Sequence, residues 1–218
     1  MRSAEIILDN NAEESMMKAL AETDNFIEQN GLTGKNAIHL RLLAEETVSM
    51  VRAMTHDIHA LFWIEKDPEK GYMIRLMAKT EMDINKKKDL LSVSTSGKNA
   101  WAKGFMGKIG DIFENGILNY CEVINLQQEY VGGSINYGNM GVGLSDDMPV
   151  EVSSVVDEQV MWSLHDYKQS LAEMKEKSDP ASEAWDELEK SVVANIAKDV
   201  IVGVKKDKVD MTIISGIM

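Results

Sequence analysis

Two apolar segments joined by a polar turn constrain the fold of this chain more than any other feature. Residues 58–82 read IHALFWIEKDPEKGYMIRLMAKTEM, and residues 66–71 form the charged, proline- and glycine-containing break. Strand-forming runs on either side of such a break predict a β-hairpin. A second alternating pair, residues 199–204 and 208–214, predicts another hairpin near the end of the sequence. We therefore expect a sheet with mainly antiparallel pairing.

Helical patterns precede and separate these hairpins. A short strand at 4–8 leads into a helix at 12–29, which we expect to end at Asn30 and Gly31 because both residues suit the left-handed turn after a helix. Its candidate N-caps, which share short hydrogen-bonding side chains, are Asp9, Asn10 and Asn11. The other expected helices cover residues 34–55, 84–91, 105–119, 157–176 and 182–197.

This order of elements predicts the fold class. It favours an α+β, two-layer sandwich in which helices cover one face of a mainly antiparallel mixed sheet. A dinucleotide-binding Rossmann fold is disfavoured, because the glycine-rich fingerprint and the repeated strand–helix alternation are missing. We expect one domain over residues 1–218, with a helical and loop insertion at about 92–180. The glycine-rich stretch at 131–149 is expected to be a loop and is a candidate interaction segment.

Composition narrows the function classes. The 218 residues are 44% apolar, enough for one large domain. A single cysteine, Cys121, rules out an intrachain disulfide framework and is expected to be an inert buried thiol. Without an apolar leader or a run of roughly 18 apolar residues, we expect a cytoplasmic protein with no membrane insertion. A net charge of −13 opposes binding to nucleic acid.

Two adjacent carboxylates interrupt an otherwise core-like helix. The segment 38–54, IHLRLLAEETVSMVRAM, carries Glu45 and Glu46 among apolar residues. One interpretation is that Glu46 faces a ligand and acts as a general base. The other is that both are surface groups, one of which pairs with Arg41 or Arg52 on the same helix and contributes a few tenths of a kcal/mol.

The helix–helix–hairpin opening, with LRLLAEETVSMV on the second helix, resembles the Bergerat ATP-binding fold of anti-sigma serine kinases and histidine kinases. The resemblance implies that ATP and Mg²⁺ are the cofactors and that Glu46 is the catalytic base. The family's magnesium-binding asparagine would stand four residues later, where this chain has Met50. A thioether does not replace a hard oxygen ligand, so the metal ligand is unknown.

Two further motifs of the family can be placed by position. The adenine-binding motif, Asp-x-Gly-x-Gly, would fall near residues 78–84, which read AKTEMDI, so Thr80 or Asp83 would contact the adenine amino group. The phosphate lid would correspond to residues 103–110, KGFMGKIG. There Gly104, Gly107 and Lys108 would hold phosphate at a helix N-terminus, or would simply form a flexible entry to a helix. The segment departs from a Walker A loop.

The resemblance predicts an adenine-nucleotide-binding protein of bacterial regulatory type, with weak or absent kinase activity. The alternative is a non-catalytic pseudo-enzyme that keeps the scaffold and binds a regulatory protein through its insertion. A pocket beside Glu46, Thr80 and residues 103–110 would favour nucleotide, whereas Met50 and apolar groups filling that space would favour the pseudo-enzyme. A homodimer is one assembly that the sequence allows.

Two residue sets support neither interpretation. His56 and His59 stand three residues apart but lack an acidic cluster that would complete a metal site. An apolar and aromatic stripe in the segment 157–176 is expected to pack in the core and consists of Trp162, Leu164, Tyr167 and Leu171.

Overall fold

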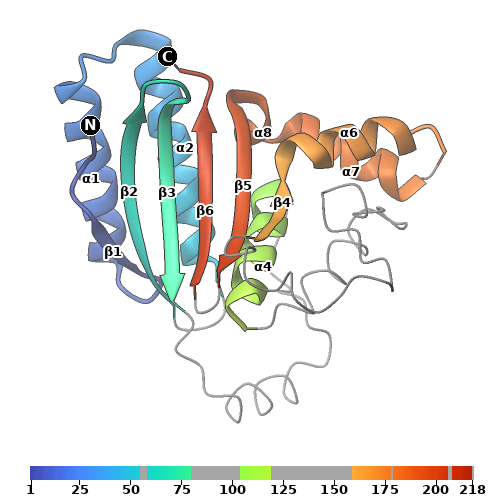
Figure 1. Ribbon diagram of the computed structural model, residues 1–218, viewed down its shortest axis with the longest axis horizontal. Helices are drawn as coiled ribbons and strands as arrows, with labels where there is room; N and C mark the ends of the chain where they lie inside the picture. The colour runs from blue at the N-terminus through green and yellow to red at the C-terminus, as the bar shows by residue number, and fades with distance from the viewer. Residues whose placement is uncertain (55–57, 80–103, 119–158, 178, 206–207, 218) are drawn as a thin grey trace, which may run out of the picture.

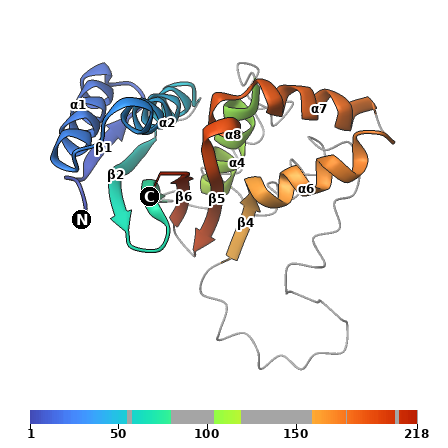
Figure 2. The same cartoon turned by 90° about the horizontal axis from the view of Figure 1, so that it is seen from above.

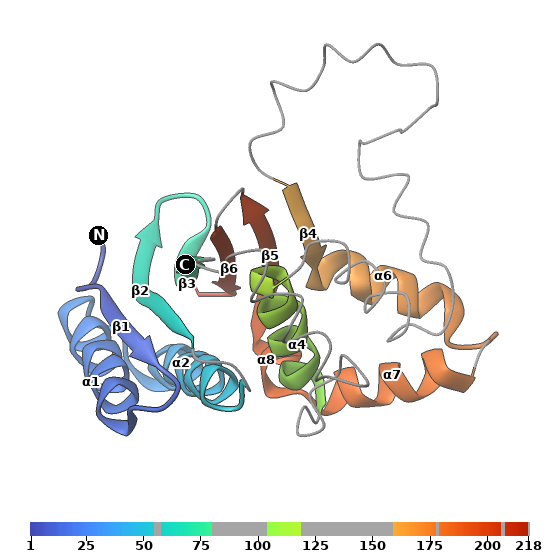
Figure 3. The ribbon, with the colours of Figure 1, turned by 90° about the horizontal axis from the view of Figure 1, so that it is seen from below.

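The chain forms one six-stranded sheet with helices packed against it (Figure 1). The computed structural model describes residues 1–54, 58–79, 104–118, 159–177, 179–205 and 208–217. The strand order is β1-β2-β3-β6-β5-β4, and each described pair is antiparallel. Views from above and below show α1, α2 and α4 on the same side of the sheet (Figures 2 and 3). The predicted α+β sandwich with helices on one face is confirmed.

The first three elements lie close to their predicted boundaries, but the residue that caps the first helix is not one of those predicted. They are β1 (Ile6–Asp9), α1 (Glu13–Gln29) and α2 (Gly34–Arg52), and Gly31 between the helices has the expected positive φ of 63°. The N-cap of α1 is Ala12, with no side-chain cap bond, so the three candidate caps were wrong.

The short polar side chains before α1 are used elsewhere in the loop. Asp9 Oδ1 accepts a 2.9 Å hydrogen bond from the Asn11 amide, which closes a turn. Asn10 joins two distant segments, because its amide group donates to the Met54 carbonyl and its Oδ1 accepts from the Ile58 amide. The bonds of Asn10 tie the end of β1 to the chain that follows α2. The Ser15 hydroxyl in the first turn of α1 also donates to the Asp9 carbonyl and accepts from the Asp9 amide, so the end of β1 is bonded to that turn as well.

Both predicted hairpins are present. The first consists of β2 (His59–Asp67) and β3 (Gly71–Lys79), and Gly71 adopts a φ of 78° that favours glycine. In its turn, Asp67 Oδ1 accepts hydrogen bonds from the amides of Lys70 at 2.9 Å and Glu69 at 2.8 Å. These two bonds, that of Lys70 first, lower the pKa of the Asp67 carboxyl. The second hairpin is β5 (Ala197–Lys205) with β6 (Lys208–Ser215).

Alternation along the strands separates a helix-covered face from an open face. On β2 and β3 the large, almost fully buried side chains facing the helices include Phe62, Ile64, Ile74 and Leu76. Their cross-strand pairs, Phe62 with Leu76 and Ile64 with Ile74, pack beneath the helix layer, which contributes Leu40 and Leu43 from α2. Burial of each such side chain stabilises the fold by about 1.5–3 kcal/mol relative to exposure.

The structure changes the second half of the prediction. The expected helix at 157–176 is instead the strand β4 (Gln159–Ser163) followed by α6 (Leu164–Met174). The strand ends and the helix begins at Ser163, whose Oγ accepts a hydrogen bond from the Asp166 amide and so caps α6. β4 pairs with β5 and lies at one end of the strand order, so part of the expected insertion belongs to the sheet.

The remaining helices follow the predicted positions with one break. The expected helix at 182–197 is divided into α7 (Asp179–Lys190) and α8 (Val192–Ile196) by Ser191, whose Oγ accepts from the Ala194 amide. The predicted helix at 105–119 is observed as α4 (Gly104–Leu118). The helix expected at 84–91 and the loop at 131–149 lie outside the described residues.

Among the described segments, no helix has both the length and the apolar character needed to cross a lipid bilayer.

Candidate functional site

The two adjacent carboxylates of α2 have different surroundings. Glu45 Oε1 lies 3.4 Å from Arg41 Nη1, and Arg41 Nε lies 2.8 Å from Asp24 Oδ1 of α1. Glu45 therefore pairs with Arg41 on the same helix, as the surface interpretation predicted, and through Arg41 it joins a charged cluster that also includes Asp24 of α1. Glu46 is partly exposed, and the described residues give its carboxylate no ion pair. The structure thus leaves Glu46, rather than Glu45, as the carboxylate that could act on a ligand.

Met50, one helical turn after Glu46, is packed inside the molecule. Its side chain is 4% exposed. It lies against Gly110 of α4 so closely that a Cβ added to Gly110 would stand 3.0 Å from Met50 Cγ. Ile109, Ile112 and Phe113 of α4 are also buried. The position where the resemblance expects a magnesium ligand is therefore occupied by an apolar contact between two helices.

The three candidate phosphate-binding residues all lie on α4. Gly104 is its first residue, and Gly107 lies one turn along and is partly exposed. Lys108 Nζ forms an ion pair with Glu187 Oε2 of α7. This pair ties α4 to α7 and uses the ammonium group that the resemblance assigned to phosphate.

The candidate adenine contacts lie in a part of the chain that the structure does not describe. Thr80 and Asp83 lie outside the described residues, as do His56 and Cys121. The last described residue before them, Lys79, is exposed at the end of β3. Of the predicted nucleotide site, the structure therefore places Glu46 on α2 and Gly104, Gly107 and Lys108 on α4.

The aromatic stripe forms a packed cluster, as expected. Trp162 comes from β4 and Tyr167 from α6, with ring centroids 5.6 Å apart. Phe105 of α4 joins them, with its ring centroid 6.0 Å from that of Trp162 and 6.3 Å from that of Tyr167. All three are almost fully buried. This cluster attaches α6 to α4 and is part of the core.

A second surface of interest is the open face of the sheet, where polar groups bond to one another. Arg75 Nε lies 2.8 Å from Glu65 Oε1, and Arg75 Nη1 donates to Thr212 Oγ1 at 2.6 Å. Trp63 Nε1 donates to Glu65 Oε2 at 3.2 Å, and the Arg2 guanidinium lies 4.3 Å from the Trp63 ring centroid. The network crosses three strands, β2, β3 and β6.

Sequence reasoning did not identify this open-face network or the contact between Met50 and Gly110. The network had a detectable signal, because Trp63, Glu65 and Arg75 occupy positions of one parity along the predicted hairpin. The contact between α2 and α4 had none, since it joins residues sixty positions apart.

Within the described segments, no three His, Cys, Asp or Glu side chains gather into a group that could hold a metal ion. His59 is 69% exposed as a side chain, and its Nδ1 lies 4.0 Å from Asp9 Oδ2. Comparison of the chain with family models, curated proteins and solved structures returned no match.

Proposed function

We propose that this protein is a non-catalytic regulatory scaffold that keeps a Bergerat-like arrangement and binds another protein. The observation that carries the proposal is the packing of Met50 against Gly110. An apolar contact fills the place where a nucleotide-binding relative would hold its magnesium ligand, and magnesium requires oxygen donors. The ion pair between Lys108 and Glu187 adds support, because α4 is bonded to α7 at the lysine that would otherwise meet phosphate.

The helices α6 and α7 are the surface that we assign to the partner. They extend past β4 at the edge of the sheet (Figure 1). The two helices contact each other through Lys175, the C-cap residue of α6, whose Nζ lies 4.1 Å from the ring centroid of Trp185 on α7. Five acidic residues and one lysine occupy the twelve positions of α7, and Glu183 and Asp186 are exposed. Complementary charge on the partner would therefore be basic.

The competing proposal is adenine-nucleotide binding with weak kinase activity. One observation favours it, because Glu46 is a partly exposed carboxylate with no ion pair in the described part of the chain. In that case Glu46 would orient the attacking hydroxyl and ATP would bring Mg²⁺ with its phosphates. The two proposals differ in whether partner binding responds to ATP.

The experiment is affinity isolation of the tagged full chain from its own cells, with and without added ATP and Mg²⁺. We expect one protein to co-purify at a constant ratio that ATP leaves unchanged. Reversing two charges on α7, with Glu183→Lys and Asp186→Lys together, should remove it. The matched control reverses two exposed charges on α1, Glu13→Lys and Glu28→Lys, and should retain it. The scaffold proposal is contradicted if no partner reaches a constant ratio or if ATP releases the partner.

A further inference from the structure

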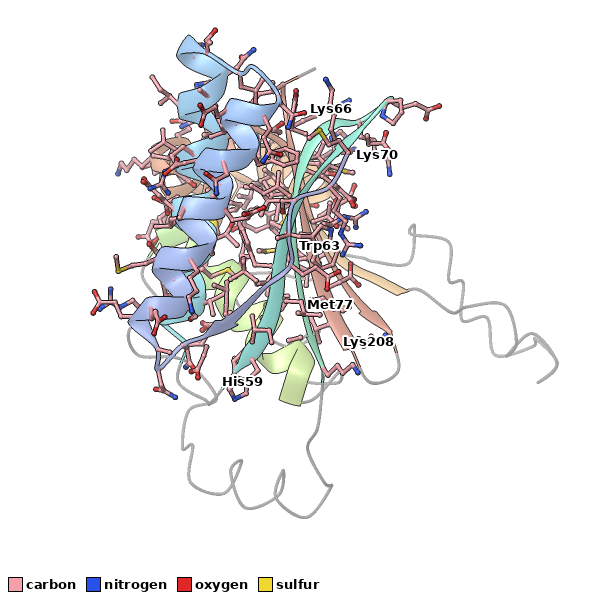
Figure 4. The ribbon with its side chains drawn as sticks, turned by 90° about the vertical axis from the view of Figure 1, so that its left-hand side faces the viewer. His59, Trp63, Lys66, Lys70, Met77 and Lys208 are labelled. Atoms are coloured by element: carbon pink, nitrogen blue, oxygen red, sulfur yellow. The ribbon has the colours of Figure 1, made fainter. Side chains whose placement is uncertain are left out.

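The open face of the sheet carries a continuous apolar patch that is not covered by the helix layer. Ile7 of β1 stands opposite Leu61 of β2, and Leu61 stands opposite Met77 of β3. Trp63, two residues after Leu61, extends the patch along β2. Ile7 is 62% exposed and the other three are partly exposed. Figure 4 shows Trp63 and Met77 on the side of the sheet away from α1. We call Ile7, Leu61, Trp63 and Met77 the open-face patch.

The composition and bonding of this face suit a protein interface. Aromatic residues, methionine and arginine are enriched in interface cores, and contiguous exposed apolar groups commonly mark binding surfaces. Asp210 stands opposite Met77, and Lys79 stands opposite Lys208 at the next pair of the same face. The polar groups around Trp63 are already paired, since Arg75 bonds to Glu65 and Thr212 and the Trp63 indole bonds to Glu65. Covering the face would therefore leave these charges and donors with their partners, which avoids the cost of burying an unpaired charge.

Charge distribution indicates which partner fits. The chain has a net charge of −13, and α1 alone carries five acidic residues against one lysine. In contrast, β1, β2, β3 and β6 together carry four acidic and four basic residues. Two copies that approach through their helices would repel each other, whereas two that approach through their sheets would not. The open face is thus close to neutral in charge on a strongly acidic molecule, and the open-face patch is its apolar part.

The size of the face is compatible with a dimer. The four long strands, β2, β3, β5 and β6, have eight or nine residues each. At a spacing of about 4.8 Å and a length of about 27 Å they present on the order of 500 Å². A stable interface of ordinary size buries about 800 Å² on each partner, with smaller areas for weaker complexes. A symmetric pairing of this face would therefore form a weak dimer.

We infer that two copies of this chain pair through their open faces around a two-fold axis, with the open-face patch of each copy against that of the other. Such an isologous interface is closed, so association stops at two copies. The inference does not rest on the proposed function, because the patch lies on the opposite side of the sheet from Glu46, Met50 and α4.

The experiment is sedimentation equilibrium of the full chain and three variants over a range of concentrations. We expect wild type to approach twice the 24.3 kDa mass of one chain. Ile7→Glu should raise the dissociation constant by at least about tenfold, because it places a charge within an apolar contact. Met77→Lys, at another position of the patch, should do the same. Ile38→Glu is the matched control, since Ile38 on α2 is 59% exposed, and it should behave as wild type.

Three results would overturn the inference. A wild type that stays monomeric at the highest concentration would show that the face has no self-association. Assemblies that keep growing beyond two copies would contradict a two-fold interface. Equal behaviour of the Ile7→Glu and Ile38→Glu variants, each with a wild-type circular dichroism spectrum, would place the interface elsewhere.

Discussion

Met50 of α2 and Gly110 of α4 approach so closely that a Cβ on Gly110 would lie 3.0 Å from Met50 Cγ. Glycine at this position allows α4 to lie directly on α2, above the sheet. The contact explains why a methionine is accommodated where the resemblance expects asparagine. It also makes the packing of these two helices sensitive to single substitutions.

Enlarging residue 110 should destabilise the fold. We expect Gly110→Leu to lower the free energy of unfolding by about 1–3 kcal/mol, because the new side chain overpacks the contact with Met50. Met50→Ala should lower it by about 2–5 kcal/mol through the lost burial and the cavity. The double variant should lose about 0.5–3 kcal/mol less than the sum. Urea unfolding of the four proteins measures this coupling, and strictly additive losses would contradict the contact. Gly107→Leu, at a partly exposed position of the same helix, is the control.

The ion pair between Lys108 and Glu187 should couple α4 to α7 weakly. Both side chains are partly exposed, so a double-mutant cycle with Lys108→Ala and Glu187→Ala should give a coupling of about 0.2–1 kcal/mol. The coupling should fall as salt is added, because screening weakens partly exposed charge pairs. A coupling of zero at low salt would show that the two groups do not interact in solution.

Asp67 should make the first hairpin sensitive to acid. Hydrogen bonds from the amides of Lys70 and Glu69 lower the pKa of its carboxyl in the folded protein. Its stabilising effect is therefore present above the unfolded-state pKa of about 3.9 and is lost as the pH falls through the lower folded-state value. We expect Asp67→Ala to lower the melting temperature at neutral pH and to have a progressively smaller effect below about pH 4. Thermal unfolding across this pH range measures the effect, with Glu69→Ala at an exposed position as the control. A difference in melting temperature between wild type and Asp67→Ala that does not change with pH would contradict this prediction.

Arg75 should require its guanidinium geometry. It bonds to Glu65 on one neighbouring strand and to Thr212 on the other, and lysine has no planar fork with which to span both. Arg75→Lys should therefore cost about 1 kcal/mol of unfolding free energy although the charge is kept. Thr212→Val tests one side of the bridge. If Arg75→Lys and wild type have the same urea midpoint and slope, the bridge does not contribute to stability.

Local patterns predicted most of the fold, and the exceptions have physical causes. The turn at 66–71 and the strand-forming runs on either side of it predicted the first hairpin, because such a break between two apolar runs is a local signal. The prediction of a single helix over 157–176 was wrong because the spacing of its apolar residues fits both a helix and a strand. Ser163, which ends β4 and caps α6, decides between them through a bond that composition alone does not reveal.

The candidate site was less predictable than the fold. The pair between Arg41 and Glu45 follows from a four-residue spacing on a helix and was correctly anticipated as an alternative. Met50 contacts Gly110, and Lys108 pairs with Glu187. In each case the partner lies on another helix, so the contact depends on tertiary packing. A resemblance over one helix and one hairpin carries no information about such contacts, which is why function must be argued from the site.

We propose that packing between α2 and α4 occupies the place of a nucleotide site. Isothermal titration of ATP and ADP into the full chain, with and without Mg²⁺, tests it most directly, with Lys108→Ala as the comparison. The account predicts no binding heat at millimolar nucleotide for a folded protein. Micromolar binding that Lys108→Ala weakens would contradict it and would establish a nucleotide site on α4.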